Sequence, residues 1–478
     1  MFSYTTIKDY HTQLQNGQTT CVEAVRCYLQ TIRNKQHLNA FLEVYETEAL
    51  ERASALDLQR NAGSELSPLH GVVVGLKDVI SYKNHHLSAS SHILENFTAV
   101  YNATAVDKLL SAGAIIIGRQ NCDEFAMGSS NENSAFGTVK NSLDETRVPG
   151  GSSGGSAVSI KAGMCMISLG SDTGGSVRQP ADFCGVVGIK PTYGRISRYG
   201  LIAYASSFDQ IGIFANSVDD AALVLEVISG PDDFDSTVSQ QEVPAYSKQL
   251  EAPGKKYRIA YFKESLENPA LDPAIRAGIE AFIKKLTGLG HEVKAVEFKL
   301  LEHVVPTYYV LTTAEASSNL SRFDGVKYGY RADIAKGDLT ELYKASRSQG
   351  FGKEVQRRIM LGTFVLSAGY FDAYFTKAQQ VRQLLCDRTK EIFTDFDAII
   401  SPTVPSPAFK IGEKSNDPVE MFLADIYTVF ANLVGIPGIS VPLFKHPNGM
   451  PFGLQVMTSH YKELPLLRLS KEFMLIAD

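Results

Sequence analysis

Two segments rich in glycine and serine contain the residues of this sequence best suited to chemistry. They read GGSSGGS at 150–156 and GSDTGGS at 170–176, and twelve of the chain's 38 glycines fall between residues 150 and 200. Glycine-rich turns allow close approach to a ligand and direct consecutive N–H groups into one hollow. A serine in such a turn can act as a nucleophile. A phosphate-binding nest and a flexible linker are the alternatives, although the apolar run at 158–169 argues against a linker.

A serine nucleophile needs a base, and the sequence favours lysine over histidine for that role. None of the ten histidines lies between His92 and His291, the part of the chain that holds both serine segments. Lys77 directly follows the apolar run GVVVGL at 71–76. Burial at the end of a strand would desolvate this lysine and lower its pKa toward neutrality. An ordinary strand-end lysine that reaches solvent is the alternative.

The first segment also satisfies the pattern G-x-S-x-G, with Ser153 at its centre. This pattern is typical of the nucleophile elbow of α/β-hydrolases, in which a strand runs directly into the serine turn. The preceding residues, DETRVP at 144–149, are poorly suited to a strand. The sequence therefore disfavours an elbow centred on Ser153.

The sequence pattern around these residues predicts the helices and strands of an α/β fold. Short β-branched runs occur at 72–74, 115–117, 186–189, 259–262, 398–400 and 439–443. Several lack polar alternation, which is typical of strands covered on both faces. Helical stretches separate them, such as the one that follows the N-cap candidate Ser217. We expect a large mixed central β-sheet covered by helices on both faces.

We expect these parts to form one domain over residues 1–478. N-terminal helices are predicted at 1–62, and the catalytic core with Lys77 and both serine segments at 63–230. A polar excursion followed by a helical cover of the substrate pocket is predicted at 231–390. The chain is expected to return to the central sheet at 391–478.

Composition and motifs argue against several classes of protein. A net charge of −6 disfavours unassisted nucleic-acid binding, and the absence of G-x-x-x-x-G-K-[ST] argues against a P-loop nucleotide site. The six cysteines are scattered without zinc spacing, so we expect free thiols and no metal site. The sequence contains no signal peptide and no apolar run of membrane-spanning length. A cytoplasmic protein is the expectation.

Lys77 and the two serine segments, with their spacings, resemble the amidase signature family and its Ser-Ser-Lys arrangement. The resemblance implies that Ser176 is the acylated nucleophile. It also implies that Ser152, preceded by a cis peptide bond, bridges Ser176 to the terminal base Lys77. The single domain would then be an amidase domain. The implied oxyanion hole consists of the backbone N–H groups of Thr173, Gly174 and Gly175.

Further segments are similar to the A subunits of glutamyl-tRNA(Gln)/aspartyl-tRNA(Asn) amidotransferases within that family. They read MGSSNENSAFG at 127–137, GRISRYG at 194–200, EASSNLSR at 315–322 and RRIMLGTF at 357–364. These segments lie outside the catalytic loops, so they specify the subfamily. Val79 departs from the usual asparagine, and the last fifteen or so residues are less typical.

This resemblance implies a glutaminase subunit that needs no cofactor of its own. Ammonia released from glutamine would pass to a B subunit, which holds mischarged tRNA together with ATP and Mg, and a C subunit would join the two. The product would be Gln-tRNA(Gln), and Asn-tRNA(Asn) is a further option because the partner selects the tRNA. A stand-alone amidase acting on another small amide is the alternative, and a non-catalytic scaffold is disfavoured by the presence of all three catalytic residues.

The same resemblance implies the residues that hold glutamine. A guanidinium suits the α-carboxylate because it can bind two oxygens at once, and a carboxylate suits the α-ammonium. The residues implied are Arg358 for the α-carboxylate and Asp425 for the α-ammonium, with Tyr309 and Ser129 lining the pocket. Arg357 is the neighbouring alternative to Arg358.

Overall fold

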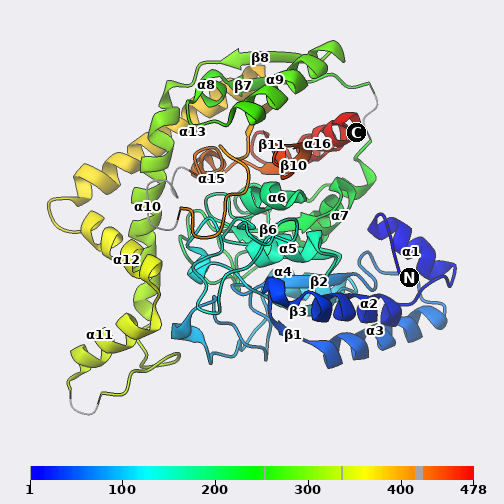
Figure 1. The fold of residues 1–478 in the computed structure, drawn as a ribbon, viewed down its shortest axis with the longest axis horizontal. Helices are drawn as coiled ribbons and strands as arrows, with labels where there is room; N and C mark the ends of the chain where they lie inside the picture. The colour runs from blue at the N-terminus through cyan, green and yellow to red at the C-terminus, as the bar shows by residue number, and fades with distance from the viewer. Residues whose placement is uncertain (1, 252–253, 335–336, 415–423, 478) are drawn as a thin grey trace.

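The structure is a computed structural model that describes residues 2–251, 254–334, 337–414 and 424–477 (Figure 1). One eleven-stranded sheet runs through these residues, in the order β1-β3-β2-β4-β6-β5-β10-β11-β9-β7-β8. The strands are β1 Phe41–Val44, β2 Val73–Lys77, β3 Ile115–Gln120, β4 Ile167–Asp172, β5 Val187–Lys190, β6 Gln210–Ala215, β7 Arg258–Phe262, β8 Glu292–Val296, β9 Ala398–Pro402, β10 Gly438–Lys445 and β11 Pro451–Met457.

The sheet mixes parallel and antiparallel pairs. β2 lies parallel to both β3 and β4, and β7 lies parallel to β8 and β9. The strands between these two groups, and the edge strand β1, pair in the antiparallel sense. Each of the six β-branched runs lies entirely or mostly within a strand, and the predicted α/β fold with a large mixed sheet is confirmed.

The second serine segment differs from the loop that its composition predicts. Residues 170–172 form the end of β4, between β2 and β6 in the sheet. A strand can end in these small polar residues here because Ser171 and Asp172 find polar partners inside the protein. The catalytic turn therefore begins only at residue 173, at the carboxyl end of a central buried strand.

Fifteen α-helices surround the sheet in the described part of the chain. Helix α7 begins after Ser217, whose side chain accepts the N–H of Asp220 and so acts as the predicted N-cap. None of these helices combines the length and the apolar character needed to cross a membrane. They are α1 Ile7–Gln15, α2 Cys21–Asn34, α3 Glu46–Asn61, α4 Thr104–Ser111, α5 Gly154–Lys161, α6 Arg178–Cys184, α7 Val218–Ile228, α8 Lys263–Glu267, α9 Pro273–Gly288, α10 Val304–Asn319, α11 Leu339–Gly350, α12 Lys353–Val365, α13 Lys377–Asp395, α15 Val429–Val434 and α16 Glu463–Ala477.

Helices α10 to α13 lie along one side of the molecule (Figure 1). α10 packs against α12, α13 and α15. Most of the described residues between 300 and 390 are therefore helical.

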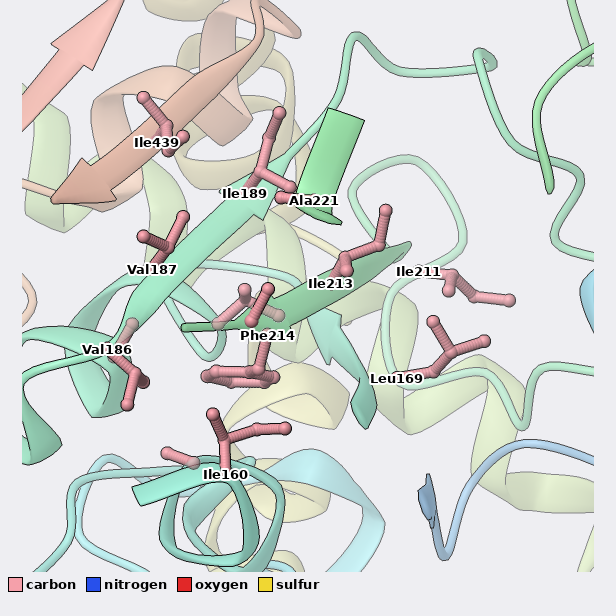
Figure 2. Packing of buried hydrophobic residues seen from close by; sticks show 14 of the residues in the cluster. Ile160, Leu169, Val186, Val187, Ile189, Ile211, Ile213, Phe214, Ala221 and Ile439 are labelled. Carbon is pink, nitrogen blue, oxygen red and sulfur yellow. The ribbon is translucent and has the colours of Figure 1, made fainter. Parts of the chain in front are cut away.

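Apolar side chains of the neighbouring strand β6 and of helix α5 pack against β4. Figure 2 shows Leu169 of β4, Phe214 of β6 and Ile160 of α5 in one buried cluster. A Cβ atom on Gly170 would lie 2.7 Å from the Phe214 ring, so only glycine allows this strand to pack so closely. The end of β4 is therefore held by core packing on one side and by polar contacts on the other.

Candidate active site

Lys77 ends β2 and is completely buried. Its Nζ lies 2.7 Å from Ser152 Oγ, 2.9 Å from Ser153 Oγ and 2.9 Å from Ser171 Oγ. The alternative of a strand-end lysine that reaches solvent is therefore wrong. The amine instead meets three hydroxyl groups from the two serine segments.

Burial lowers the pKa of Lys77 to about 8, because a charged ammonium loses its hydration in the interior. The carboxylates of Asp123 and Asp172 act in the opposite direction, since negative charge favours the ammonium. The net effect leaves a lysine that can exchange a proton close to neutral pH.

The peptide bond between Gly151 and Ser152 is cis, as the family resemblance implies. The N–H of Gly151 donates to Gln179 Oε1 at 2.8 Å. A Cβ atom on Gly151 would lie 2.1 Å from Asp123 Oδ2, so no larger residue fits here without a shift of Asp123. Asp123 is itself fixed by N–H groups of the 127–137 segment, including that of Asn131 at 2.9 Å.

Ser176 lies in a turn that the Asp172 carboxylate organises. Asp172 accepts the N–H of Gly175 at 2.8 Å and the N–H of Val177 at 3.1 Å, so it holds the residues on both sides of Ser176. Ser176 itself is 8% exposed. Arg178 donates to Asp172 through Nη2 at 2.9 Å and through Nε at 3.1 Å.

The charge of Asp172 is secured by this pairing. Burial opposes ionisation, but Arg178, Lys190 and the amide of Asn432 outweigh it and lower the pKa of Asp172 to about 2. The carboxylate therefore stays ionised at every physiological pH. It can keep accepting the backbone N–H groups of the nucleophile turn throughout that range.

The two serine segments lie against each other. The N–H of Ser153 donates to the carbonyl of Ser176 at 3.3 Å, and the Ser153 hydroxyl donates to the carbonyl of Ser171 at 3.1 Å. Ser153 and Ser171 are polar partners of Lys77 that sequence reasoning did not assign. The signal in the sequence was their position within the two serine segments, where Ser153 follows Ser152 and Ser171 precedes Asp172.

The backbone N–H groups proposed for the oxyanion hole differ in their surroundings. That of Gly175 already donates to Asp172. Those of Thr173 and Gly174 donate to no acceptor within the described residues. The Thr173 hydroxyl is anchored on Asp209 Oδ1 at 2.7 Å, which fixes the start of the turn. Thr173 and Gly174 are therefore the donors available to a developing negative charge.

The four residues implied for substrate binding also meet in space. Asp425 Oδ2 accepts the Ser129 hydroxyl at 2.7 Å and the Tyr309 hydroxyl at 3.1 Å. The Arg358 guanidinium carbon lies 5.5 Å from the centre of the Tyr309 ring. Burial raises the pKa of Asp425 to about 7, against the lowering effects of Ser129 and Arg358.

The structure distinguishes Arg358 from its neighbour Arg357. Arg358 is buried, and its Nη1 donates to the Tyr204 hydroxyl at 2.8 Å, while its Nε donates to Glu354 at 2.8 Å. The side chain of Arg357 is 48% exposed and pairs with the other oxygen of Glu354. Only Arg358 faces the aromatic pocket beside Asp425.

Gln179 joins the substrate pocket to the bridging serine. Its Nε2 donates to the carbonyl of Ser129 at 2.8 Å, and its Oε1 accepts the N–H of Gly151. Because Gln179 is fully buried, both contacts form without competition from water. Gln179 therefore fixes the loop that carries Ser129 and the loop that carries Ser152 relative to each other.

The described residues contain no group of three or more His, Cys, Asp or Glu side chains placed to hold a metal ion. The six cysteines are all free thiols. The polar groups gathered around Lys77 are instead hydroxyls and backbone amides, which suit proton transfer and oxyanion binding.

The family model described as "Amidase" matches residues 23–467. The chain belongs to the amidase family. The predicted family membership is confirmed.

Curated relatives narrow the family membership further. The A subunit of the glutamyl-tRNA(Gln) amidotransferase of Koribacter versatilis (strain Ellin345) is 52% identical over 96% of this chain and 95% of its own length. The protein of the same name from Chlorobium phaeobacteroides (strain BS1) is 49% identical over 98% of both chains. These near full-length matches confirm the expected kinship with amidotransferase A subunits, and favour it over a stand-alone amidase.

Solved structures give the same fold. The glutamyl-tRNA(Gln) amidotransferase A subunit from Thermotoga maritima is 38% identical, with a TM-score of 0.75 over 94% of this chain and 93% of that one. The native peptide amidase from Stenotrophomonas maltophilia is 28% identical, with a TM-score of 0.84 over 99% of this chain and 97% of that one. The amidase chain is thus an amidase-type enzyme subunit in both sequence and fold.

Proposed function

We propose that this chain is the glutaminase subunit of a tRNA-dependent amidotransferase, a cytoplasmic enzyme of translation. It hydrolyses glutamine and supplies ammonia for the ATP- and Mg-dependent conversion of Glu-tRNA(Gln) to Gln-tRNA(Gln) on its B subunit, with a C subunit in the complex. The observation that carries this proposal is the buried cluster in which Arg358 and Asp425 both contact Tyr309, because a free amino acid needs a cation and a carboxylate close together. The names of the curated relatives support it.

The hydrogen bonds of Lys77 support one direction of proton transfer. The Ser153 hydroxyl donates its proton to the Ser171 carbonyl, so it can only accept from Lys77. A neutral amine has two N–H groups and one lone pair. With the N–H groups directed to Ser153 and Ser171, the lone pair faces Ser152, whose hydroxyl is the nearest of the three.

Ser152 then relays the proton of Ser176 to Lys77 as Ser176 Oγ attacks the side-chain amide carbon of glutamine. The tetrahedral oxyanion is stabilised by the N–H groups of Thr173 and Gly174, and a donor of this kind contributes about 10²–10³-fold in rate. The same relay returns the proton to the leaving nitrogen, which departs as ammonia. Water activated by Lys77 then hydrolyses the γ-glutamyl ester.

Recognition of glutamine uses the two charges of its amino-acid end. Arg358 binds the α-carboxylate, and the ionised Asp425 binds the α-ammonium with the help of Ser129 and Tyr309. Both groups are buried, and a plain amide that lacks the α-carboxylate and the α-ammonium forms neither of these charged contacts. The pocket therefore selects a free amino acid.

Exposed apolar side chains support assembly with a protein partner. On α12 and the segment after it, Met360 is 68% exposed, and Phe364, Tyr370 and Tyr374 are each more than 40% exposed. The Phe364 ring contacts both tyrosine rings, so the three form one aromatic patch. Monomeric proteins rarely expose such patches outside interaction sites. We call these four residues the α12 patch.

Amidation of Glu-tRNA(Gln) by the chain purified together with candidate B and C subunits tests this function. We expect glutamine to support amidation, with ammonium chloride as a control nitrogen source that bypasses the glutaminase site. Amidation from ammonium chloride with none from glutamine would contradict the proposal. So would glutamine hydrolysis that proceeds at the same rate with and without partners and tRNA while no amidated tRNA forms.

A further inference from the structure

The turn at 425–428 contacts both the substrate pocket and the nucleophile turn. At its first residue, the Asp425 side chain accepts Ser129 and Tyr309 hydroxyls in the pocket. The N–H of Thr428 donates to the carbonyl of Asp425 at 3.1 Å, which closes the turn. At its last residue, Thr428 reaches the segment that carries Ser176.

Thr428 is completely buried and directs its hydroxyl at the nucleophile turn. Its Oγ1 lies 2.7 Å from the carbonyl oxygen of Gly174 and 3.2 Å from that of Asp425. The hydroxyl has a single proton, and the shorter contact identifies Gly174 as its principal acceptor. A Cβ atom on Gly175 would lie 2.1 Å from Thr428 Oγ1, so the two segments are in direct contact.

The peptide group between Gly174 and Gly175 is consequently held at both ends. Its carbonyl accepts from Thr428, and its N–H donates to Asp172. Since a peptide group is planar, these two bonds fix its orientation. The N–H of Gly174 belongs to the preceding peptide group, which meets this plane at the Gly174 Cα, and Ser176 follows on the other side through Gly175. A fixed plane at 174–175 therefore limits the positions that both the Gly174 N–H and Ser176 can take.

A second contact keeps Thr428 in place. Its carbonyl accepts Nη1 of Arg178 at 2.8 Å, and the same guanidinium binds Asp172. Asn432, one turn further along, donates to Asp172 at 2.9 Å. The ion pair of Arg178 and Asp172 therefore holds the backbone of both turns. The Thr428 hydroxyl adds a separate contact between the turns, to the Gly174 carbonyl.

We infer that Thr428 is a positioning residue that couples the ammonium-binding carboxylate Asp425 to the oxyanion turn at 173–176. This inference rests on the proposed function, since it takes the ligand at Asp425 to be glutamine. Loss of the hydroxyl leaves the buried Gly174 carbonyl without a donor and frees the peptide plane that Thr428 orients. The rate of acylation then falls, while the groups that bind glutamine remain in place.

Thr428→Val and Thr428→Ser separate the hydroxyl from the shape of the side chain. In the assembled complex, we expect Thr428→Val to lower kcat for glutamine about 10- to 100-fold with KM changed less than about 3-fold. Thr428→Ser keeps the hydroxyl, so its kcat should stay within about 3-fold of wild type. Wild-type kcat in Thr428→Val, or equal losses in both variants, would overturn the inference. If Thr428→Val does not fold, Thr428→Ala, which also lacks the hydroxyl, takes its place.

A double-mutant cycle with Asp425→Asn tests the coupling. If Thr428 and Asp425 act through one turn, the combined loss in kcat/KM should be at least about 3-fold smaller than the product of the two single losses. A combined loss equal to that product would show that the two residues act independently and would overturn the coupling.

Failure of the proposed function gives a different result. A wild-type complex that hydrolyses butyramide but not glutamine would contradict the glutaminase assignment alone. The Thr428 variants would then be compared with butyramide as substrate. A lower kcat in Thr428→Val than in Thr428→Ser would still support the positioning role, and equal values would overturn it.

Discussion

The amine of Lys77 shows how burial brings the pKa of a lysine close to neutral pH. Burial lowers its pKa to about 8, although nearby carboxylates act in the opposite direction. A lysine with this pKa is partly neutral at physiological pH and still basic enough to accept a proton from serine. Burial also raises the pKa of Asp425 to about 7, so the base and the ammonium-binding group titrate close together.

These two pKa values predict how activity depends on pH. The active forms are neutral Lys77 and ionised Asp425, and a rise in pH produces both. We expect kcat/KM for glutamine to rise from pH 6 through pH 8 and to level off near pH 9, about one pH unit above the pKa of Lys77. Steady-state kinetics over this range provide the measurement. A profile that falls between pH 6 and 8 would contradict the assignment of Lys77 as a neutral base.

The nucleophile assignment makes a separate prediction. Ser176→Ala removes the attacking oxygen, so we expect glutamine hydrolysis and glutamine-dependent amidation to fall at least about 10³-fold. Amidation from ammonium chloride should continue at the wild-type rate, because that reaction does not use this site. Ser153→Ala is the matched comparison, since Ser153 also contacts Lys77 but is not the proposed nucleophile. Residual ammonia release at the normal rate in Ser176→Ala would contradict the role of Ser176.

At the scale of elements, the site depends on the end of β4 and on the helix α6 that follows it. Asp172 ends the strand and Arg178 begins the helix, and their ion pair is fully buried. Removal of one partner from a buried pair leaves an uncompensated charge, which costs far more than the loss of an exposed pair. The strand-to-helix turn therefore has the rigidity that oriented N–H donors need.

Arg178→Met tests the contribution of this pair to stability. We expect it to lower the free energy of unfolding by about 3–5 kcal/mol in urea denaturation. Arg33→Met, which breaks the exposed pair with Glu46, is the control and should leave the free energy of unfolding nearly unchanged. Equal effects of the two substitutions would contradict a structural role for the buried pair. The low pKa of Asp172 stabilises the fold above about pH 4, and this contribution is lost as the pH falls toward about 2.

Close packing of glycine backbone in the nucleophile turn gives a further prediction. Gly175 has a φ of +131°, and a Cβ atom there would overlap Thr428. We expect Gly175→Ala to lower kcat at least about 100-fold and the free energy of unfolding by about 2–4 kcal/mol. Gly288→Ala, at the end of α9 with open space around its Cβ, should leave kcat unchanged. Wild-type kcat in Gly175→Ala would contradict the tight packing of this turn.

At the scale of the whole molecule, the sequence predicts the sheet strands and the segments that meet around Lys77 better than it predicts the remaining contacts of these segments. Apolar runs mark strands such as β2 because burial demands hydrophobic side chains there. The end of β4 does not follow this pattern, because its polar residues form hydrogen bonds with buried partners. Thr428 lies 254 residues from Gly174 along the chain, and such contacts depend on a strand order that local pattern does not encode.

The α12 patch is the surface on which we expect the partner subunits to bind. Figure 1 places α12 on the side of the molecule away from α3, so a substitution on α3 serves as a control. We expect Phe364→Ser to weaken binding of the B and C subunits about 10- to 100-fold, because buried aromatic side chains dominate interface energies. Leu58→Ser on α3, where Leu58 is 70% exposed, should leave binding unchanged.

Sedimentation or light scattering of the mixed subunits measures this assembly, and circular dichroism checks that both variants fold. Equal binding by Phe364→Ser and wild type would contradict the α12 patch as the docking surface for the partner. Weaker binding by Phe364→Ser alone would place the partner beside the helix that carries Arg358. The partner that uses the ammonia would then contact the same helix that binds the glutamine carboxylate, so assembly and substrate recognition would share one element.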